Sequence, residues 1–97
     1  MIKVTQTQSD DPMTFAVTVS DEGNQCHYQV TLSNETYREL SGNTDAGPEQ
    51  CIEAAFRFLL DREPKEAILP GFDITLISSY FPDFNTVFID YLNNITD

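Results

Sequence analysis

The chain has 97 residues, of which 16 are acidic and 5 are Lys or Arg, so its formal net charge is −11 at pH 7. Nucleic acids and anionic membranes are bound mainly through Lys and Arg side chains that neutralise phosphate. The charge therefore argues against direct binding to either, and it favours a basic protein as the partner. Apolar residues make up 40% of the chain, including seven Phe and four Tyr, which is too many for a disordered acidic segment. We therefore expect one folded domain over residues 1–97.

The sequence gives no sign of export or of membrane insertion. Residues 1–6 lack the apolar stretch that a signal peptide needs, and no later run approaches the length of a membrane span. Cys26 and Cys51 are not closely spaced. We therefore expect a cytoplasmic protein with both thiols reduced.

The first third of the chain alternates apolar and polar residues with a period of two, which is typical of strands buried on one face. The pattern covers residues 13–19 and 26–32. Between them, Asp21-Glu22-Gly23-Asn24 contains residues that tolerate the positive φ of a tight turn. This predicts an antiparallel hairpin, and Ile2 and Val4 suggest a third strand beside it.

A period of 3.6 residues takes over after residue 33. We expect a short helix capped by Ser33 or Asn34 and stopped at Gly42. Pro48 suits the first turn of the next helix, and Pro64 ends it. The apolar stripe of this second helix consists of Ile52, Ala55, Phe56, Leu59 and Leu60.

Two further elements follow. Residues 74–80 fit either a helix or a buried strand, and we favour the helix with Asp73 as its cap. A last helix follows Pro82. The order predicts an α+β domain in which residues 1–33 form an antiparallel β-hairpin or three-stranded meander. Residues 34–97 are then three to five short helices packed on one face of that sheet.

Three segments together resemble a known group of proteins. They are Phe58-Leu59-Leu60-Asp61-Arg62-Glu63-Pro64, Phe72-Asp73-Ile74 and Tyr80-Phe81-Pro82-Asp83-Phe84. Over residues 50–85 the chain resembles small, single-domain bacterial proteins of uncharacterised function. The resemblance implies a bacterial, cytoplasmic setting, and it brings no activity, cofactor or catalytic residue with it.

The residues that usually carry chemistry are few. His27 is the one histidine, and its neighbour Cys26 should point to the opposite face of a strand. One His and two Cys are too few for the four-ligand zinc site that proteins commonly build. The four glycines are too dispersed for a phosphate-binding loop. We therefore predict no catalytic residue, no cofactor and no metal site.

Aromatic residues gather near the C-terminus, where residues 72–91 contain six of them. They either fill the core of the domain or form part of a groove or homodimer contact, because interface cores are rich in aromatic side chains. The candidate partner-binding residues are Tyr80, Phe81, Asp83, Phe84, Phe88, Asp90 and Tyr91.

These observations favour a non-enzymatic, acidic protein-interaction or regulatory module. Its partner is expected to be a basic protein, and a homodimer is left open. In a sharper version the carboxylates mimic the phosphates of a nucleic acid, which requires one contiguous acidic face. The alternative is a small carboxylate-dependent enzyme, or a subunit whose site is completed at a dimer interface. An enzyme should have a concave pocket that holds an acid of raised pKa, whereas a binding module should have a flat or grooved patch without one.

Overall fold

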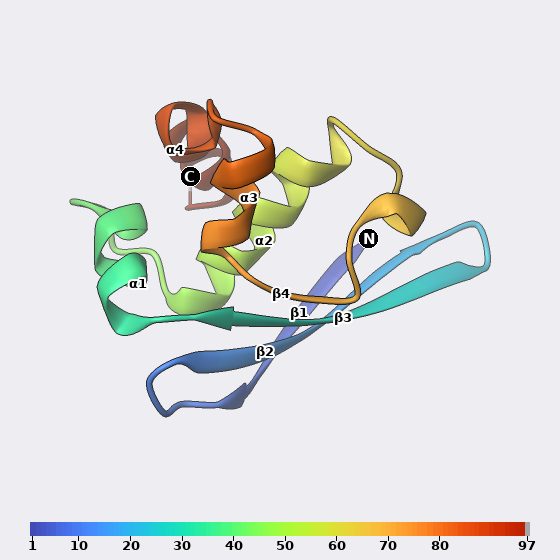
Figure 1. Ribbon diagram of the computed structural model, residues 1–97, viewed down its shortest axis with the longest axis horizontal. Helices are drawn as coiled ribbons and strands as arrows, with labels where there is room; N and C mark the ends of the chain where they lie inside the picture. The colour runs from blue at the N-terminus through green and yellow to red at the C-terminus, as the bar shows by residue number, and fades with distance from the viewer. Residues whose placement is uncertain (97) are drawn as a thin grey trace.

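A four-stranded sheet with helices on one face is the architecture of the computed structural model, which describes residues 1–96 (Figure 1). The elements in chain order are β1 (Ile2–Gln8), β2 (Met13–Asp21), β3 (Asn24–Leu32), α1 (Asn34–Ser41), α2 (Pro48–Leu60), the 3-10 turn η1 (Lys65–Ala67), β4 (Gly71–Asp73), α3 (Thr75–Tyr80) and α4 (Phe84–Thr96). The predicted α+β class is therefore confirmed, as is the order of a sheet followed by short helices.

Strands β1, β2 and β3 form the antiparallel meander that the alternating pattern predicts. The turn between β2 and β3 consists of Glu22 and Gly23, and both have a positive φ, of 34° and 90°. A two-residue hairpin turn needs this backbone conformation because its twist then matches that of the strands. Phe15, Val17 and Val30 are fully buried on the face towards the helices. Polar side chains occupy the opposite face of the sheet.

Strand β4 was not predicted, and it lies in the half of the chain that was expected to be entirely helical. It pairs in parallel with β3, with Phe72 opposite Val30. The backbone N–H of Ile74 donates to the carbonyl of Thr31 at 3.0 Å, and the hydroxyl of Thr31 donates to the carboxylate of Asp73 at 2.6 Å. Three residues are too few to display a period-two pattern.

Helix α1 begins and ends where its capping residues predict, whereas α2 begins at the predicted Pro48 but ends at Leu60, before the expected end near Pro64. The hydroxyl of Ser33 accepts the backbone N–H of Thr36 at 3.1 Å and thereby caps α1. Gly42 ends α1 with a φ of 54°, a conformation that costs little without a Cβ atom. Helix α2 starts at Pro48, whose missing N–H is no loss in a first turn.

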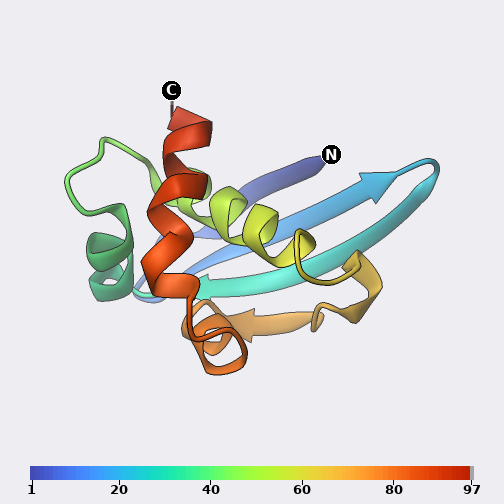
Figure 2. The ribbon, with the colours of Figure 1, turned by 90° about the horizontal axis from the view of Figure 1, so that it is seen from above.

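Residues 75–80 are helical, which confirms the favoured interpretation of this segment. The carboxylate of Asp73 accepts the backbone N–H and the hydroxyl of Thr75 at 3.1 and 2.6 Å. These hydrogen bonds stabilise the abrupt transition from strand β4 to helix α3, which takes place within two residues. After Pro82, α4 turns back and crosses α2 on the side away from the sheet (Figure 2).

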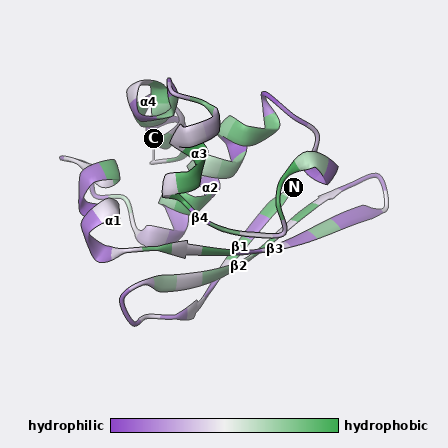
Figure 3. Cartoon of the chain, viewed as in Figure 1, coloured by the Kyte–Doolittle hydropathy of each residue, from purple (hydrophilic) through white to green (hydrophobic). Residues whose placement is uncertain are grey.

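Helix α2 is the centre of the molecule, because it packs against the sheet on one side and against α4 on the other (Figures 1 and 2). Phe56 contacts Tyr28 of the sheet, with 5.1 Å between ring centroids, while Phe58 contacts Phe84 of α4 at 4.9 Å. Hydrophobic residues lie between these layers, and the loops at the two ends of the sheet are hydrophilic (Figure 3). The core thus extends through three layers of one small domain.

Candidate functional site

An apolar groove lies between the C-terminal end of α2, the segment that contains η1 and β4, and helix α3. Its volume is about 380 Å³. The side chains that line it are Leu59, Glu63, Ala67, Ile68, Leu69, Phe72, Leu76, Ile77, Tyr80 and Phe81. Eight of the ten are Ala, Leu, Ile or Phe, so the groove has an apolar floor and walls.

Two large side chains at the groove are exposed to solvent. Leu69 is 46% exposed and Tyr80 is 67% exposed. Phe72 and Phe81 are half-buried, and Phe81 meets the ring of Phe58 in the core edge to face, with centroids 5.8 Å apart. The groove is therefore continuous with the core at its base and offers apolar surface at its rim.

The wall formed by η1 is tied to the sheet through Lys65. The Nζ of Lys65 lies 3.0 Å from a carboxylate oxygen of Asp21 and 2.9 Å from Glu66, and the Lys65 side chain is only 7% exposed. The phenol of Tyr28 donates to the carbonyl of Lys65 at 2.5 Å. Contacts with Glu66 and Asp21 hold the pKa of Lys65 above its ordinary value, so it stays charged. Two of these contacts, with Asp21 and Tyr28, tie the wall to the sheet.

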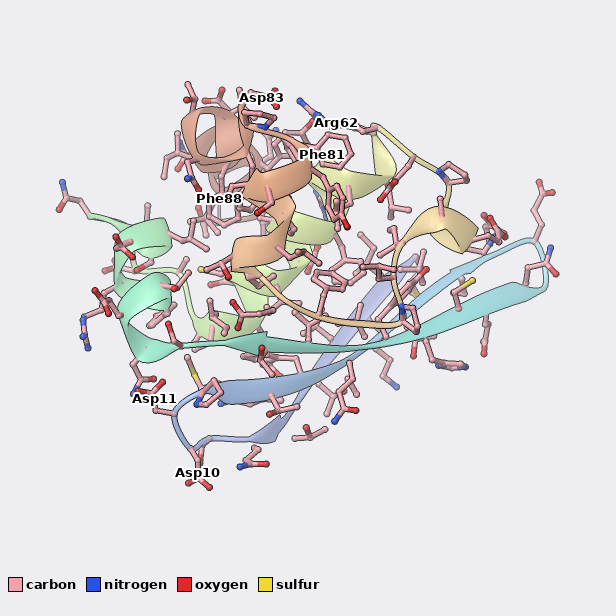
Figure 4. The ribbon with its side chains drawn as sticks, viewed as in Figure 1. Asp10, Asp11, Arg62, Phe81, Asp83 and Phe88 are labelled. Atoms are coloured by element: carbon pink, nitrogen blue, oxygen red, sulfur yellow. The ribbon has the colours of Figure 1, made fainter. Side chains whose placement is uncertain are left out.

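The charge at the groove is negative. Glu63 is the one carboxylate in the lining; it is half-buried, and it is not part of the ion pairs formed among residues 1–96. The cations closest to it in sequence are already paired. Arg62 lies 2.8 Å from Asp83 and stacks 3.7 Å from the centre of the Phe58 ring, and Figure 4 shows Arg62 beside Asp83 at the top of the molecule. Lys65 is held by Asp21 and Glu66.

The seven residues predicted to bind a partner do not share one surface. Tyr80 and Phe81 line the groove. Phe84 and Phe88 are 1% and 2% exposed, so in this conformation they fill the core and do not reach a partner. For these two rings the alternative of core packing applies.

The remaining three predicted residues belong to α4 or the turn before it. Asp83 pairs with Arg62. Tyr91 is half-buried, and its hydroxyl donates to the carboxylate of Asp61 at 2.5 Å, which raises the pKa of the phenol. Asp90 is exposed on α4. None of the three lines the groove. Sequence spacing grouped them with Tyr80 and Phe81 as one candidate surface, and the fold separates them from those two residues.

Sequence reasoning also missed most of the groove. Leu69 directly precedes Pro70, which leads into β4, and an apolar side chain beside a chain break is a weak signal of exposure. Leu76 and Glu63 become neighbours of the same groove only because α3 folds back beside the end of α2. No local sequence pattern predicts that these two side chains line the same groove.

Acidic residues occupy several separate parts of the surface. Asp10 and Asp11 lie in the loop at one end of β2, and Asp21 and Glu22 lie at its other end (Figures 1 and 4). Others are found on α1, α2 and α4. The outward-facing residues of β2 and β3, such as Thr18, His27 and Gln29, include no acid.

Residues with catalytic or metal-binding chemistry are not gathered at the groove. His27 is exposed on the outer face of the sheet, with its Nδ1 3.1 Å from the hydroxyl of Thr18, whereas Cys26 is half-buried on the other face. Among residues 1–96, no three His, Cys, Asp or Glu side chains lie close enough to hold a metal ion. In the same part of the chain, no helix has the length and apolar character needed to cross a membrane.

Comparison of the chain with protein-family models, with curated proteins and with solved structures gives no match.

Proposed function

We propose that the protein is a non-enzymatic, acidic interaction module of the cytoplasm, and that the groove beside α3 is the surface that contacts its protein partner. The observation that carries the proposal is the exposure of Leu69 and Tyr80 at the rim of an apolar groove. Four large apolar side chains are exposed within residues 1–96, and two of them meet here. An apolar patch with a polar surround is typical of an interaction site.

The composition of the groove supports binding to a protein. Tyr side chains are enriched among the residues that dominate interface energies, because they combine a large apolar area with a hydroxyl and lose little conformational freedom. Covering Tyr80 and Leu69 would remove their apolar area from water. The net charge of −11 would accelerate the encounter with a basic partner and make it sensitive to salt.

The same composition speaks against catalysis at the groove. General acid–base chemistry and nucleophilic catalysis use at least two reactive groups in mutual reach. The lining contributes one carboxylate, from Glu63, and one phenol, from Tyr80. An enzyme here would have to receive its second group from another subunit, whereas a binding role requires nothing beyond the groove itself.

Affinity capture with matched variants tests the proposal. Tagged wild-type protein is compared with the double variant Leu69→Ser/Tyr80→Ser and with Ile89→Ser, which alters an apolar side chain that is 38% exposed on α4, outside the groove. The substituted side chains are 38–67% exposed, so each change should cost no more than about 1.5 kcal/mol, and both variants should fold. Captures from lysate of the source cells are made at low and high salt and identified by mass spectrometry.

The expected result is a basic protein that wild type and Ile89→Ser retain at low salt and that the double variant loses. The thermal unfolding midpoint of each variant checks that the fold is intact. Equal retention by the double variant and by wild type would show that the partner binds elsewhere on the surface.

A further inference from the structure

We propose that the occupant of the groove is an amphipathic helix of the partner, which buries an apolar side chain between Leu69 and Tyr80 and places a Lys or Arg against Glu63. This inference rests on the proposed function, since it names the chemistry of the segment that the groove accepts. It is carried by the lining of the groove, by the state of Glu63 and by the pairing of the nearby cations.

The size and lining of the groove favour side chains presented by a helix. Its volume of about 380 Å³ is at the lower end of the range for pockets that enclose a drug-sized group, so it accepts one or two side chains of a larger segment. A helix satisfies its own backbone hydrogen bonds, and it can enter a groove that offers only side chains. In this lining, the side chains of Glu63 and Tyr80 are the ones with hydrogen-bonding groups.

An extended segment would need a free strand edge for its backbone. The neighbouring edge is β4, which is three residues long and follows Pro70, a residue without a backbone N–H. The carboxylate of Asp73, at the end of β4, is already engaged by Thr31 and Thr75. Strand addition gains its affinity from a row of main-chain hydrogen bonds, and β4 is too short to supply one.

The negative charge of Glu63 in the groove favours a basic helix over an acidic one. Glu63 lines an apolar groove, and a partner that covers the groove would remove water from its carboxylate. Burying an unpaired carboxylate is costly, whereas a cation with hydrogen-bonding geometry offsets that cost. The chain does not provide that cation through its neighbours, because Arg62 is paired with Asp83 and Lys65 with Asp21 and Glu66. The cation therefore comes from the partner.

Electrostatics also discriminates against two other occupants. An acidic amphipathic helix would place like charge against Glu63, which costs affinity and gives specificity. A second copy of this chain would bring its own Glu63 to the contact together with a net charge of −11. The groove is thus suited to a basic helix and unsuited to self-association.

Three synthetic peptides serve as probes. The first, of about 15 residues, has Leu at i, i+3, i+4 and i+7 positions and Lys elsewhere, a pattern that makes one helical face apolar. The second replaces each Lys by Glu. The third has the composition of the first with Leu at alternate positions, the pattern of a strand. Each is titrated into ¹⁵N-labelled protein at physiological salt while the amide resonances are recorded by NMR.

The helical Leu–Lys peptide should saturate and shift the amides of the groove, in residues 59–69 and 72–81. The Leu–Glu peptide and the alternating peptide should each bind roughly tenfold more weakly or not at all. Glu63→Gln should weaken the helical Leu–Lys peptide by about tenfold, because a desolvated charge pair is lost. Asp90→Asn removes one exposed charge on α4, and it should change the affinity by less than about twofold.

Several results would overturn the inference. Equal binding of the Leu–Glu or alternating peptide at the groove would remove the basic-helix requirement and leave the groove as a contact surface. Shifts scattered over the acidic surface, with equal losses in Glu63→Gln and Asp90→Asn, would show nonspecific attraction. Groove resonances that move on dilution of the protein alone would identify a second copy as the occupant. The proposed function fails by a separate result, namely capture that is unchanged by the groove variants.

Discussion

The aromatic residues within residues 72–91 differ in burial, and burial decides whether a side chain fills the core or lies at the surface. The hydropathy of a residue does not predict which of the two applies. Phe84, Phe88 and Leu92 recur every four residues and face the core, so their burial could be predicted from α4 periodicity. Tyr80 belongs to α3, where the turn at Pro82 breaks the register with α4. The 67% exposure of the Tyr80 side chain depends on how α3 packs against the rest of the fold. The sequence pattern does not predict that packing.

Two neighbours on α4 provide a test of this contrast. Phe88→Ala should lower the free energy of unfolding by about 3–5 kcal/mol, because it leaves a cavity where a ring is 2% exposed. Ile89→Ala, at a side chain that is 38% exposed, should lower it by less than about 1.5 kcal/mol. Urea unfolding measures both. Similar losses for the two variants would mean that α4 is rotated about its axis relative to the structure described.

The two cysteines should differ sharply in reactivity. Cys51 is 1% exposed, and burial raises the pKa of its thiol to about 12, so almost no thiolate exists at pH 8. Cys26 is half-buried on β3. With iodoacetamide at pH 8, mass spectrometry should find Cys26 labelled in the native protein and Cys51 labelled only after unfolding. Equal labelling rates would contradict the burial of α2 beneath α4.

At the scale of elements, local signals were sufficient for the meander, for α1 and for α2, since each has its own periodicity and caps. They were insufficient for residues 61–73. Pro64 predicted a break after α2, although α2 already ends at Leu60, and β4 pairs with a strand about forty residues earlier in the chain. The Lys65–Asp21 ion pair spans 44 residues. Contacts of this range depend on the completed fold, so the groove that they shape could not be predicted.

The free energy of unfolding should depend on pH through Asp73, which lies where β3, β4 and α3 meet. Burial alone would raise the pKa of Asp73, but the hydrogen bonds from Thr31 and Thr75 outweigh it and leave the pKa below its ordinary value. The folded state therefore binds fewer protons here than the unfolded state. The resulting stabilisation is complete above the ordinary pKa near 4, and it is lost as the pH falls below it.

Asp73→Asn should therefore be less stable than wild type at pH 7, by on the order of 1 kcal/mol, and the difference should shrink as the pH falls below about 4. Urea unfolding at pH 7 and at pH 3 measures it. The other acids are common to both proteins and cancel in the comparison. A difference that stays constant between the two pH values would show that the Asp73 carboxylate does not gain from its hydrogen bonds.

The η1 wall of the groove should loosen when its ion pair is removed. Lys65→Gln should accelerate hydrogen exchange at the amides of Ala67 and Ile68, whose hydrogen bonds close the η1 turn. Arg57→Gln is the control, because it removes an i,i+4 ion pair to Glu53 on the surface of α2, outside the η1 turn, and such surface pairs contribute little. Unchanged exchange in Lys65→Gln would mean that the Tyr28 hydrogen bond and the apolar contacts hold this wall unaided.

At the scale of the whole molecule, the proposed basic partner rests on composition, and the proposed place of contact rests on the fold. The charge of −11 follows from the sequence, yet its distribution over both ends of the sheet and several helices does not. Three of the five basic side chains are engaged in ion pairs with acids of the same chain. In the proposed function, the acidic side chains attract a basic partner from several directions, and the apolar groove is the contact surface.

The most direct test of the groove as the contact surface is photo-crosslinking in the cells that make the protein. A benzophenone amino acid is placed at Tyr80 in one version and at His27, on the outer face of the sheet, in another. Both sites are exposed, so both versions should fold. The account predicts a discrete adduct with a basic protein from position 80 and none from position 27. A discrete adduct from position 27, with none from position 80, would contradict it.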